Sequence, residues 1–160
     1  MRKLLIVILT FSLLTIILSV VSCNAPTDLN PPGDNFAGYV YFADSSFAFT
    51  DGFYAVSVYE DTIIAFNSKP IKSDSLSGIE LIGYNYQARY KVYGIPPGKY
   101  FIAATWNKYP VQENDIPIIL GTYGCDTNMT CSTHVKLVFP NFTGNYINII
   151  SWADTSKKMF

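Results

Sequence analysis

From Phe36 onward, apolar and polar side chains alternate along the chain with a period of two. The alternation is clearest between Tyr86 and Val92, where Gln87, Arg89 and Lys91 separate apolar residues. The same alternation sets Tyr54, Val56 and Val58 on the core face of their segment and Ala55 and Ser57 on the solvated face. Successive side chains of a strand point to opposite faces, so this pattern puts the charges in water and the other face on a core. The pattern predicts seven strands: Gly38–Ala43, Phe53–Glu60, Thr62–Asn67, Tyr86–Gly94, Lys99–Trp106, His134–Phe139 and Tyr146–Trp152.

Turn-forming residues separate most of these segments. Ile95–Gly98 contains two prolines and a glycine, which predict a tight reversal between two core strands. Asn141–Asn145 predicts another turn around its glycine, and Ile118–Tyr123 predicts a short strand inside the long stretch 107–133. No helical stripe is present after the N-terminal segment. We therefore expect an all-β fold, a seven-stranded antiparallel Greek-key sandwich, after an N-terminal signal helix.

The first residues carry an export signal. Arg2 and Lys3 precede an unbroken apolar run from Leu4 to Val21, which is the pattern of a signal peptide. The run is long for a cleaved signal and is close to the length of a membrane-spanning helix. The residues that follow it, Val20-Val21-Ser22-Cys23, resemble the lipobox of bacterial lipoproteins. In that family the cysteine receives a diacylglyceryl group, and the signal is cut just before it.

Two other interpretations of the N-terminus stay open. Val20 and Ser22 also suit ordinary signal cleavage, and the apolar run also suits an uncleaved anchor. The cysteine count favours the lipid, because modification of Cys23 leaves Cys125 and Cys131 as a pair, whereas an unmodified Cys23 would be a free thiol in an oxidising compartment. The resemblance implies a bacterial envelope protein, and Asn24 after the cysteine favours the outer membrane, on its periplasmic or surface face.

These segments predict the domain organisation. We expect a signal peptide over residues 1–22, a tether over 23–36, a β-sandwich over 37–155 and a C-terminal tail over 156–160. The tether is rich in proline, glycine and short polar residues. Without the two basic residues of the signal, acidic residues outnumber basic ones, which argues against nucleic acid as a partner.

The segment Tyr90–Ile102 resembles a hairpin of the transthyretin-like sandwiches, which include the carboxypeptidase regulatory domain and its bacterial relatives. In that group an apolar residue and Pro-x-Gly follow a strand, and a strand led by tyrosine returns. Gly38–Phe42 resembles the first strand of the group, whereas the Thr-Asp-x-x-Gly pattern often found before the hairpin is missing. The resemblance implies accessory, binding or stability modules without enzyme activity.

Catalytic residues are hard to find in this sequence. His134 is the one histidine, and its alternation with core residues predicts a position facing solvent. Ser57 has no flanking glycines of a nucleophile elbow. Glu60 and Asp61 are neighbours on a predicted strand, so they point to opposite faces and do not flank one glycosidic bond. We therefore expect no enzyme.

The segment 107–133 contains candidate ligands for metals. Cys125, Cys131 and His134 are three possible zinc ligands, but an oxidising compartment favours a disulfide between the two cysteines. Oxygen ligands for calcium are present at three acidic residues, although their spacing matches no known loop: Glu113, Asp115 and Asp126. We therefore expect a disulfide, and neither a metal nor a cofactor.

Aromatic residues are the remaining candidates for ligand binding. Trp106, Tyr109 and Tyr123 lie in or beside the long stretch, where exposed rings would stack on sugars and buried rings would pack in the core. Our leading hypothesis is a membrane-anchored lipoprotein that acts as a non-enzymatic accessory or protein-interaction module, with envelope proteins as partners. The alternative is a carbohydrate-binding protein that uses these rings on glycans, and a hydrolase ranks third.

Overall fold

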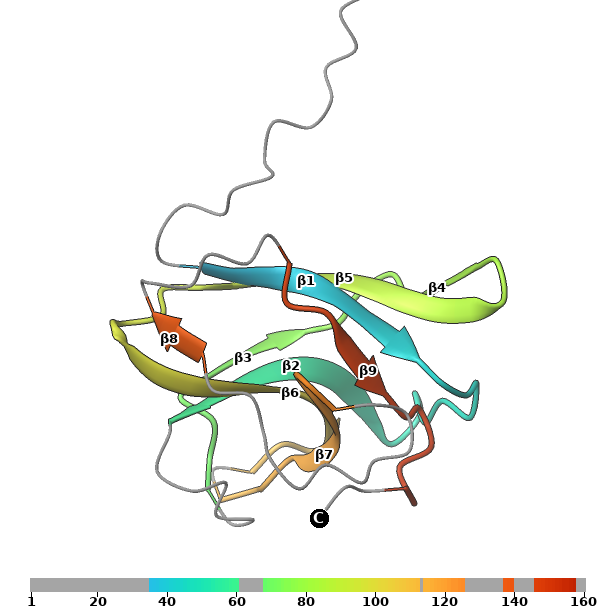
Figure 1. Ribbon diagram of the computed structural model, residues 1–160. Helices are drawn as coiled ribbons and strands as arrows, with labels where there is room; N and C mark the ends of the chain where they lie inside the picture. Colours follow the sequence, from blue (N-terminus) through green and yellow to red (C-terminus); the bar gives the residue numbers. More distant parts are fainter. Residues whose placement is uncertain (1–34, 61–67, 113, 126–136, 140–145, 158–160) are drawn as a thin grey trace, which may run out of the picture. The chain divides into compact units, whose positions relative to one another are not determined.

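The computed structural model describes residues 35–60, 68–112, 114–125, 137–139 and 146–157, all within one structural unit, Pro31–Phe160. These residues contain strands and no helix, so the predicted all-β class is confirmed. No segment among them is a helix long and apolar enough to cross a bilayer. The strands form two layers, which face each other in Figure 1.

The first sheet has the strand order β4-β5-β1-β9. Its members are β4 (Glu80–Ile82), β5 (Asn85–Tyr93), β1 (Asn35–Phe42) and β9 (Ile149–Ser151). β1 pairs antiparallel with β5 and parallel with β9, so one pair departs from the antiparallel pattern that we expected. β1 begins within the range expected for the tether, which we had extended to residue 36.

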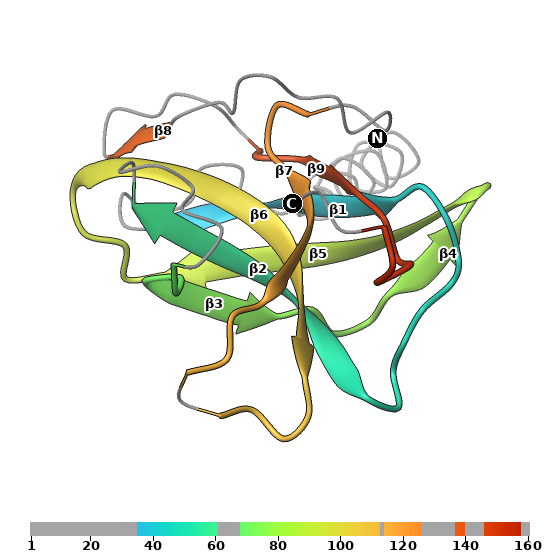
Figure 2. The same cartoon turned by 90° about the horizontal axis from the view of Figure 1, so that it is seen from below.

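The second sheet has the order β3-β2-β6-β7, and β8 also pairs with β6. Its members are β3 (Lys72–Ser75), β2 (Gly52–Glu60), β6 (Gly98–Lys108), β7 (Ile118–Thr122) and β8 (Leu137–Phe139). All of its pairs are antiparallel. Seen from below, β2, β3 and β6 lie in front of β1 and β5 (Figure 2).

The core lies between the two sheets, as the alternation predicted for β5. Its side chains are apolar and aromatic residues at every second position of the long strands. Edge-to-face ring contacts, such as Phe36 with Phe139 at 5.4 Å between centroids, add to the apolar burial. The residues of the long strands in this core are Phe36, Val40, Phe42, Tyr54, Val56, Val58, Ala88, Tyr90, Val92, Tyr100, Ile102, Ala104 and Trp106.

The central strands of the second sheet, β2 and β6, are buried on both faces over most of their length. Ala55 and Ser57 alternate with the core residues of β2, and we had expected them on a solvated face, yet both are fully buried. The Ser57 hydroxyl lies 2.8 Å from the Ser73 hydroxyl oxygen and 2.8 Å from that of Thr105. Small side chains and mutually satisfied hydroxyl groups allow this face to leave water at low cost. The solvated face predicted for β2 is therefore wrong.

The reversal at Ile95–Gly98 is present, but it does not form a hairpin. β5 lies in the first sheet and β6 in the second, so the turn carries the chain from one layer to the other. The left-handed backbone is at Gly94, with φ of 66°, whereas Gly98 is not among the glycines with positive φ. The prolines and glycine marked the change of direction, but the pairing partners of both strands come from elsewhere in the chain.

Five of the predicted strands correspond to β1, β2, β5, β6 and β9, and the short strand expected near residue 118 corresponds to β7. β8 begins at Leu137, and residues 134–136 of that predicted strand lie outside the described part, as do Thr62–Asn67 and the turn 141–145. β3 and β4 were missed. Both are short and largely exposed, so they leave little hydrophobic pattern in the sequence.

Candidate functional site

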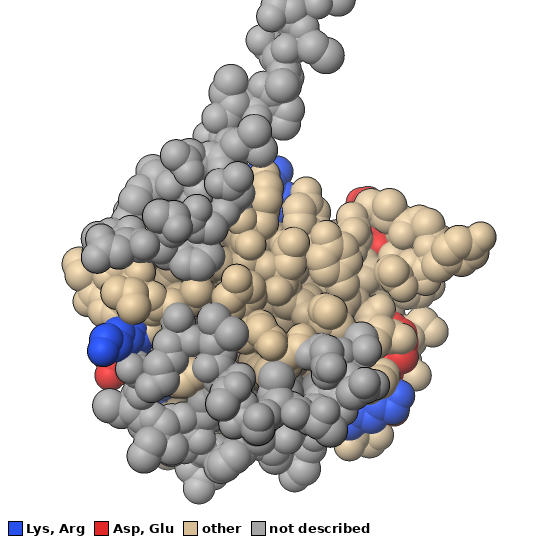
Figure 3. Space-filling model, in the orientation of Figure 1, with Lys and Arg blue, Asp and Glu red and all other residues tan. Residues whose placement is uncertain are grey.

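The turn between β4 and β5 exposes three large apolar side chains. Leu81 is 56% exposed, Ile82 is 55% exposed and Tyr84 is fully exposed, at 101%. Gly83 has φ of 66°, as the first central residue of a type II′ two-residue turn requires. We call Leu81, Ile82, Gly83 and Tyr84 the hairpin tip. At the right of Figure 3 the hairpin extends from the body, and its end carries no charged side chain.

The hairpin tip lies at one end of the first sheet, and the start of β1 lies at the other. Asn35 pairs with Tyr93, Phe42 pairs with Tyr86, and the tip follows beyond Tyr86. At about 3.3 Å per residue, the eight residues of β1 separate the two ends by roughly 25 Å. The chain that leads back to residues 1–34 therefore leaves the sheet at the end opposite the tip.

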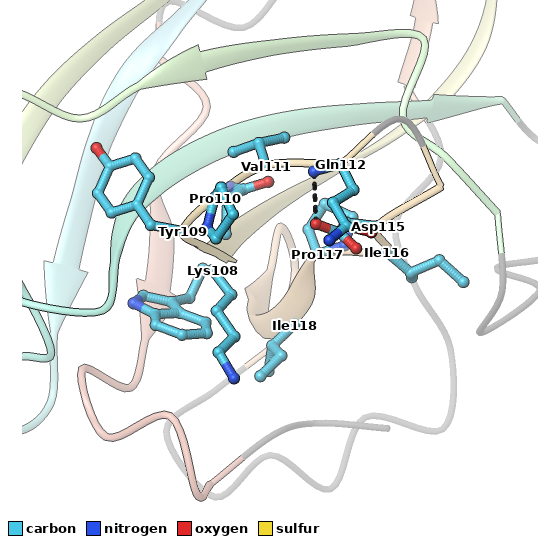
Figure 4. Close-up of a pocket in the computed structure, with 11 residues that line it drawn as sticks. Lys108, Tyr109, Pro110, Val111, Gln112, Asp115, Ile116, Pro117 and Ile118 are labelled. Carbon is cyan, nitrogen blue, oxygen red and sulfur yellow. Dashed lines mark hydrogen bonds between the residues drawn. The ribbon is translucent and has the colours of Figure 1, made fainter.

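A second feature is a hollow between the end of β6 and the start of β7, with a volume of 420 Å³. Figure 4 shows the loop that follows Lys108 arching over it and returning to Ile118. The lining is mainly apolar, with four polar residues among aromatic, proline and branched aliphatic ones: Trp106, Asn107, Lys108, Tyr109, Pro110, Val111, Gln112, Asp115, Ile116, Pro117 and Ile118.

Two of the polar groups at this hollow are already engaged. The indole nitrogen of Trp106 donates to the Ala48 carbonyl at 3.1 Å. The Asp115 carboxylate accepts from the backbone nitrogen of Gln112 at 2.7 Å, the dashed line in Figure 4. The side-chain nitrogen Nδ2 of Asn107 differs, because it is buried and has no hydrogen-bond partner. This nitrogen lies beneath the surface of the hollow and is not open to it.

The structure places the three candidate aromatic residues differently. Trp106 is only 7% exposed and belongs to the core, so it has no open ring face for stacking. Tyr109 is 53% exposed, packs near Phe53 at 5.4 Å between ring centroids, and points to the side opposite Asp115 in Figure 4. Tyr123 packs against the core and does not line the hollow. Trp106 and Tyr109 both lie at the hollow, but they do not form an open aromatic surface on which a sugar ring would stack.

Several other candidates lie outside the described residues. They are Cys23, Asp61, Glu113, Asp126, Cys131 and His134. Cys125 is buried, and its sulfur lies 2.7 Å from the Thr122 hydroxyl oxygen. Within the described ranges, no three His, Cys, Asp or Glu side chains gather as a metal site. The disulfide and the lipid on Cys23 therefore stay predictions.

Comparison with protein-family models, curated proteins and solved structures found no match to this chain.

Sequence reasoning missed the hairpin tip and Asn107. A signal for the tip was available, since Gly83-Tyr84 between two short apolar stretches suits a II′ turn. The sequence did not show that Leu81 and Ile82 are exposed, because apolar residues in a short run have the same pattern as core residues. Asn107 is the penultimate residue of β6, and its amide nitrogen is buried although the residue is polar and close to the end of the strand.

Proposed function

We propose that this chain is an exported lipoprotein, anchored through Cys23, that acts as a non-enzymatic protein-interaction module. The observation that carries the proposal is the hairpin tip, with three large apolar side chains held in water on a two-residue turn. Burying one such side chain at an interface contributes about 1.5–3 kcal/mol. Leu81 and Ile82 are consecutive strand residues on opposite faces, so exposed apolar side chains on both sides of the tip suit insertion into a partner.

The position of the tip favours a protein partner over the membrane. In this proposal a lipid holds residue 23, and the tether joins the sheet at Asn35, at the end opposite the tip. A coil of about twelve residues spans roughly 20 Å, so it keeps that end of the domain near the bilayer. The tip is at the end of the sheet farther from this point of attachment. Its complement is an apolar recess on a neighbouring envelope protein, with room for one aromatic and two aliphatic side chains.

The finer fold assignment also belongs to this proposal. Two facing, mostly antiparallel sheets support a Greek-key sandwich, although the segment that resembles a transthyretin-like hairpin joins the two sheets instead of pairing with itself. The described residues contain nine strands where that sandwich has seven, and the short strands β3 and β4 are the ones outside the predicted set. β4 carries two residues of the tip, so an addition to the basic sandwich would supply the interaction surface.

The glycan-binding alternative receives less support. It requires an aromatic face open to a sugar ring, and Trp106 is buried with its N–H already donated to Ala48. Tyr109 alone is exposed, next to Phe53. We therefore do not propose glycan binding or hydrolysis.

Site-specific photo-crosslinking of the full chain in its native cell tests the proposal. A crosslinking amino acid replaces Tyr84 in one sample and Tyr93 in the other. Both residues are exposed tyrosines, at opposite ends of β5. We expect one discrete protein adduct from position 84 and none from position 93. The identified partner should then bind the Leu81→Ser, Ile82→Ser double variant at least about a hundredfold more weakly in solution.

Other outcomes would exclude the proposed role of the tip. Equal adducts from both positions would indicate random encounters, and crosslinks from position 84 to lipid alone would indicate that the tip lies in the membrane. An unchanged affinity of the double variant for the identified partner would exclude the tip as the contact.

A further inference from the structure

The outer face of the first sheet, the side turned away from the second sheet in Figure 1, carries tyrosines next to two basic residues. Core residues occupy the even positions of β1 and β5, so the odd positions of both strands lie on the outer face. Tyr146, which precedes β9, joins this face through its contact with Tyr39. We call six residues, all at least partly exposed, the tyrosine face: Tyr39, Tyr41, Arg89, Lys91, Tyr93 and Tyr146.

The tyrosine rings of this face pack against one another. Tyr39 contacts Tyr41 at 6.1 Å between ring centroids, with the planes 28° apart, and Tyr146 at 5.9 Å. The rings of Tyr39 and Tyr41 turn a face toward each other, which leaves little open ring face for stacking on a sugar. Strand side chains stand roughly perpendicular to the sheet, so the hydroxyl ends lie farthest from it. An apolar ring with a polar end is the arrangement that enriches tyrosine at membrane–water interfaces.

The charges on the outer face are separated along the strands. Arg89 and Lys91 lie between the middle of β5 and its end at Tyr93, which pairs with the start of β1. Neither basic residue has an ion pair in the described part of the chain, and the Lys91 Nζ atom lies 5.0 Å from the centroid of the Tyr93 ring. An acidic residue, Glu80, lies opposite Gln87, toward the hairpin tip. Positive charge is therefore concentrated toward the end of the sheet that the tether joins.

The tether makes an anionic membrane surface the expected occupant of this face. The inference rests on the proposed lipid anchor at Cys23, because the tether leads from that residue to β1 at Asn35. About twelve residues of coil keep the sheet within reach of the headgroups, so even a weak contact is enough to populate a docked state. Basic side chains are attracted to an anionic leaflet over a Debye length, about 10 Å.

We propose that, in the anchored protein, the tyrosine face docks on a bilayer surface that contains anionic lipids. Arg89 and Lys91 bind the headgroup phosphates, and the tyrosine rings lie at the level of the headgroups. Repulsion between Glu80 and the anionic headgroups keeps the other end of the sheet off the lipid. The hairpin tip then stays free for a protein partner.

Paramagnetic broadening measures this contact. Isotope-labelled full chain is assembled in lipid nanodiscs that carry a gadolinium chelate on some headgroups, and the broadening of each backbone amide is recorded. The nanodiscs contain phosphatidylcholine alone or a mixture with phosphatidylglycerol. In the mixture we expect strong broadening at residues 37–41 and 89–93, less at β4 and little at β3, and we expect it to decrease as salt is added. Broadening in phosphatidylcholine alone should be weaker.

The double variant Arg89→Gln, Lys91→Gln tests the basic residues, because it removes both charges and keeps polar side chains. It should lower the ratio of docked to undocked protein at least about tenfold. The double variant Lys72→Gln, Lys108→Gln is the matched control, since it removes two charges from exposed lysines of the second sheet. It should leave the broadening unchanged.

The crosslinking sample with the reactive residue at position 93 gives a second measurement, because Tyr93 belongs to the tyrosine face. Its adducts should be lipid. A discrete protein adduct from this position would overturn the proposal and make this face a protein contact.

Three results of the broadening experiment would also overturn the proposal: equal broadening at the tyrosine face and at β3, equal broadening with and without phosphatidylglycerol, and equal losses in the two double variants. A full chain that does not co-elute with nanodiscs would exclude the lipid anchor and this docking with it. Co-elution without broadening would exclude the docking alone.

Discussion

The hydroxyl of Tyr54 donates a hydrogen bond to the carbonyl oxygen of Ala153, which lies 99 residues further along the chain, at a distance of 2.5 Å. The same hydroxyl accepts from the backbone nitrogen of Ala48 at 2.9 Å. One buried oxygen thus joins β2, the loop before it and the segment after β9. Asp44 reinforces the junction, because its carboxylate accepts from the backbone nitrogen of Ala153 and pairs with Lys157 at 3.1 Å.

Tyr54→Phe should destabilise the domain by about 2 kcal/mol, because it leaves two backbone groups without their partner in a buried place. Chemical denaturation of the full chain, followed by the fluorescence of Trp106 and Trp152, measures this change. Tyr84→Phe is the control, since its hydroxyl is fully exposed and should contribute nothing. Equal stability of the two variants would contradict the role assigned to the Tyr54 hydroxyl.

Tyr59 predicts how stability changes at high pH. Burial raises the pKa of Tyr59 to about 12, from an ordinary value near 10. The folded state therefore keeps this proton after the unfolded chain has lost it. The stability of the folded state that depends on protonated Tyr59 is fully present below about pH 10. It is lost as the pH rises to about 12, at roughly 1.4 kcal/mol per pH unit.

The hydroxyl of Tyr59 is buried without a well-formed hydrogen bond, although Ser57 beside it opposes part of the rise in its pKa. Tyr59→Phe should therefore raise stability near neutral pH by about 1 kcal/mol and flatten the decline between pH 10 and 12. Some decline should remain, because burial also raises the pKa of Tyr90. Denaturation curves over this pH range test both effects. A variant less stable than wild type at pH 7 would show that the hydroxyl is satisfied.

The two glycines around the β5-to-β6 turn should respond differently to substitution. Gly94 has φ of 66° and open space around it, so Gly94→Ala should cost about 1 kcal/mol and Gly94→Asn less. At Gly98 the difficulty is space, since a methyl group there would lie 2.6 Å from the Tyr100 hydroxyl oxygen. That hydroxyl donates to the Pro96 carbonyl at 2.7 Å.

For Gly98, Ala and Asn should therefore both be costly, and Asn should bring no relief. The denaturation midpoints of the Ala and Asn variants at positions 94 and 98 test these expectations. A rescue by Asn at position 98 instead of 94 would show that the left-handed residue is at position 98.

Cys23→Ala tests the lipid anchor. Two acyl chains bind a membrane stably, whereas one binds only marginally, so loss of the diacylglyceryl group should release the protein or stall its processing. Fractionation and gel migration of the full chain give the result, and Cys125→Ala serves as a cysteine control. A variant that fractionates and migrates like wild type would rule out the lipid.

The proposed disulfide between Cys125 and Cys131 is tested by mass spectrometry of protein purified without reductant. A closed ring of seven residues contributes about 2.4 kcal/mol in the chain-entropy model. We expect a mass lower than that of the reduced form by two hydrogen atoms. Two thiols that react with an alkylating agent before reduction, especially with bound zinc, would favour the metal site instead.

Much of the fold follows from local chemistry. The alternation around Tyr90 placed β5 and its inward face, and the prolines after Ile95 placed the change of direction. β3 and β4 were beyond this reasoning, because an exposed edge strand needs little apolar pattern and takes its hydrogen bonds from a neighbour such as β5. The burial of Ser57 was hidden for a similar reason, since a hydroxyl is inexpensive to bury only when other hydroxyls meet it.

The sequence by itself determined the all-β class, most of the strands and the candidate cysteines, because side-chain period and turn residues act over a few neighbours. Only the tertiary structure decided which sheet each strand joins and whether Trp106 faces water. It also decided that Leu81 and Tyr84 are exposed while the Asn107 amide is buried. The pairing of strands and the burial of side chains depend on segments that are far apart in the chain. A local sequence pattern therefore does not show which segment covers a given side chain.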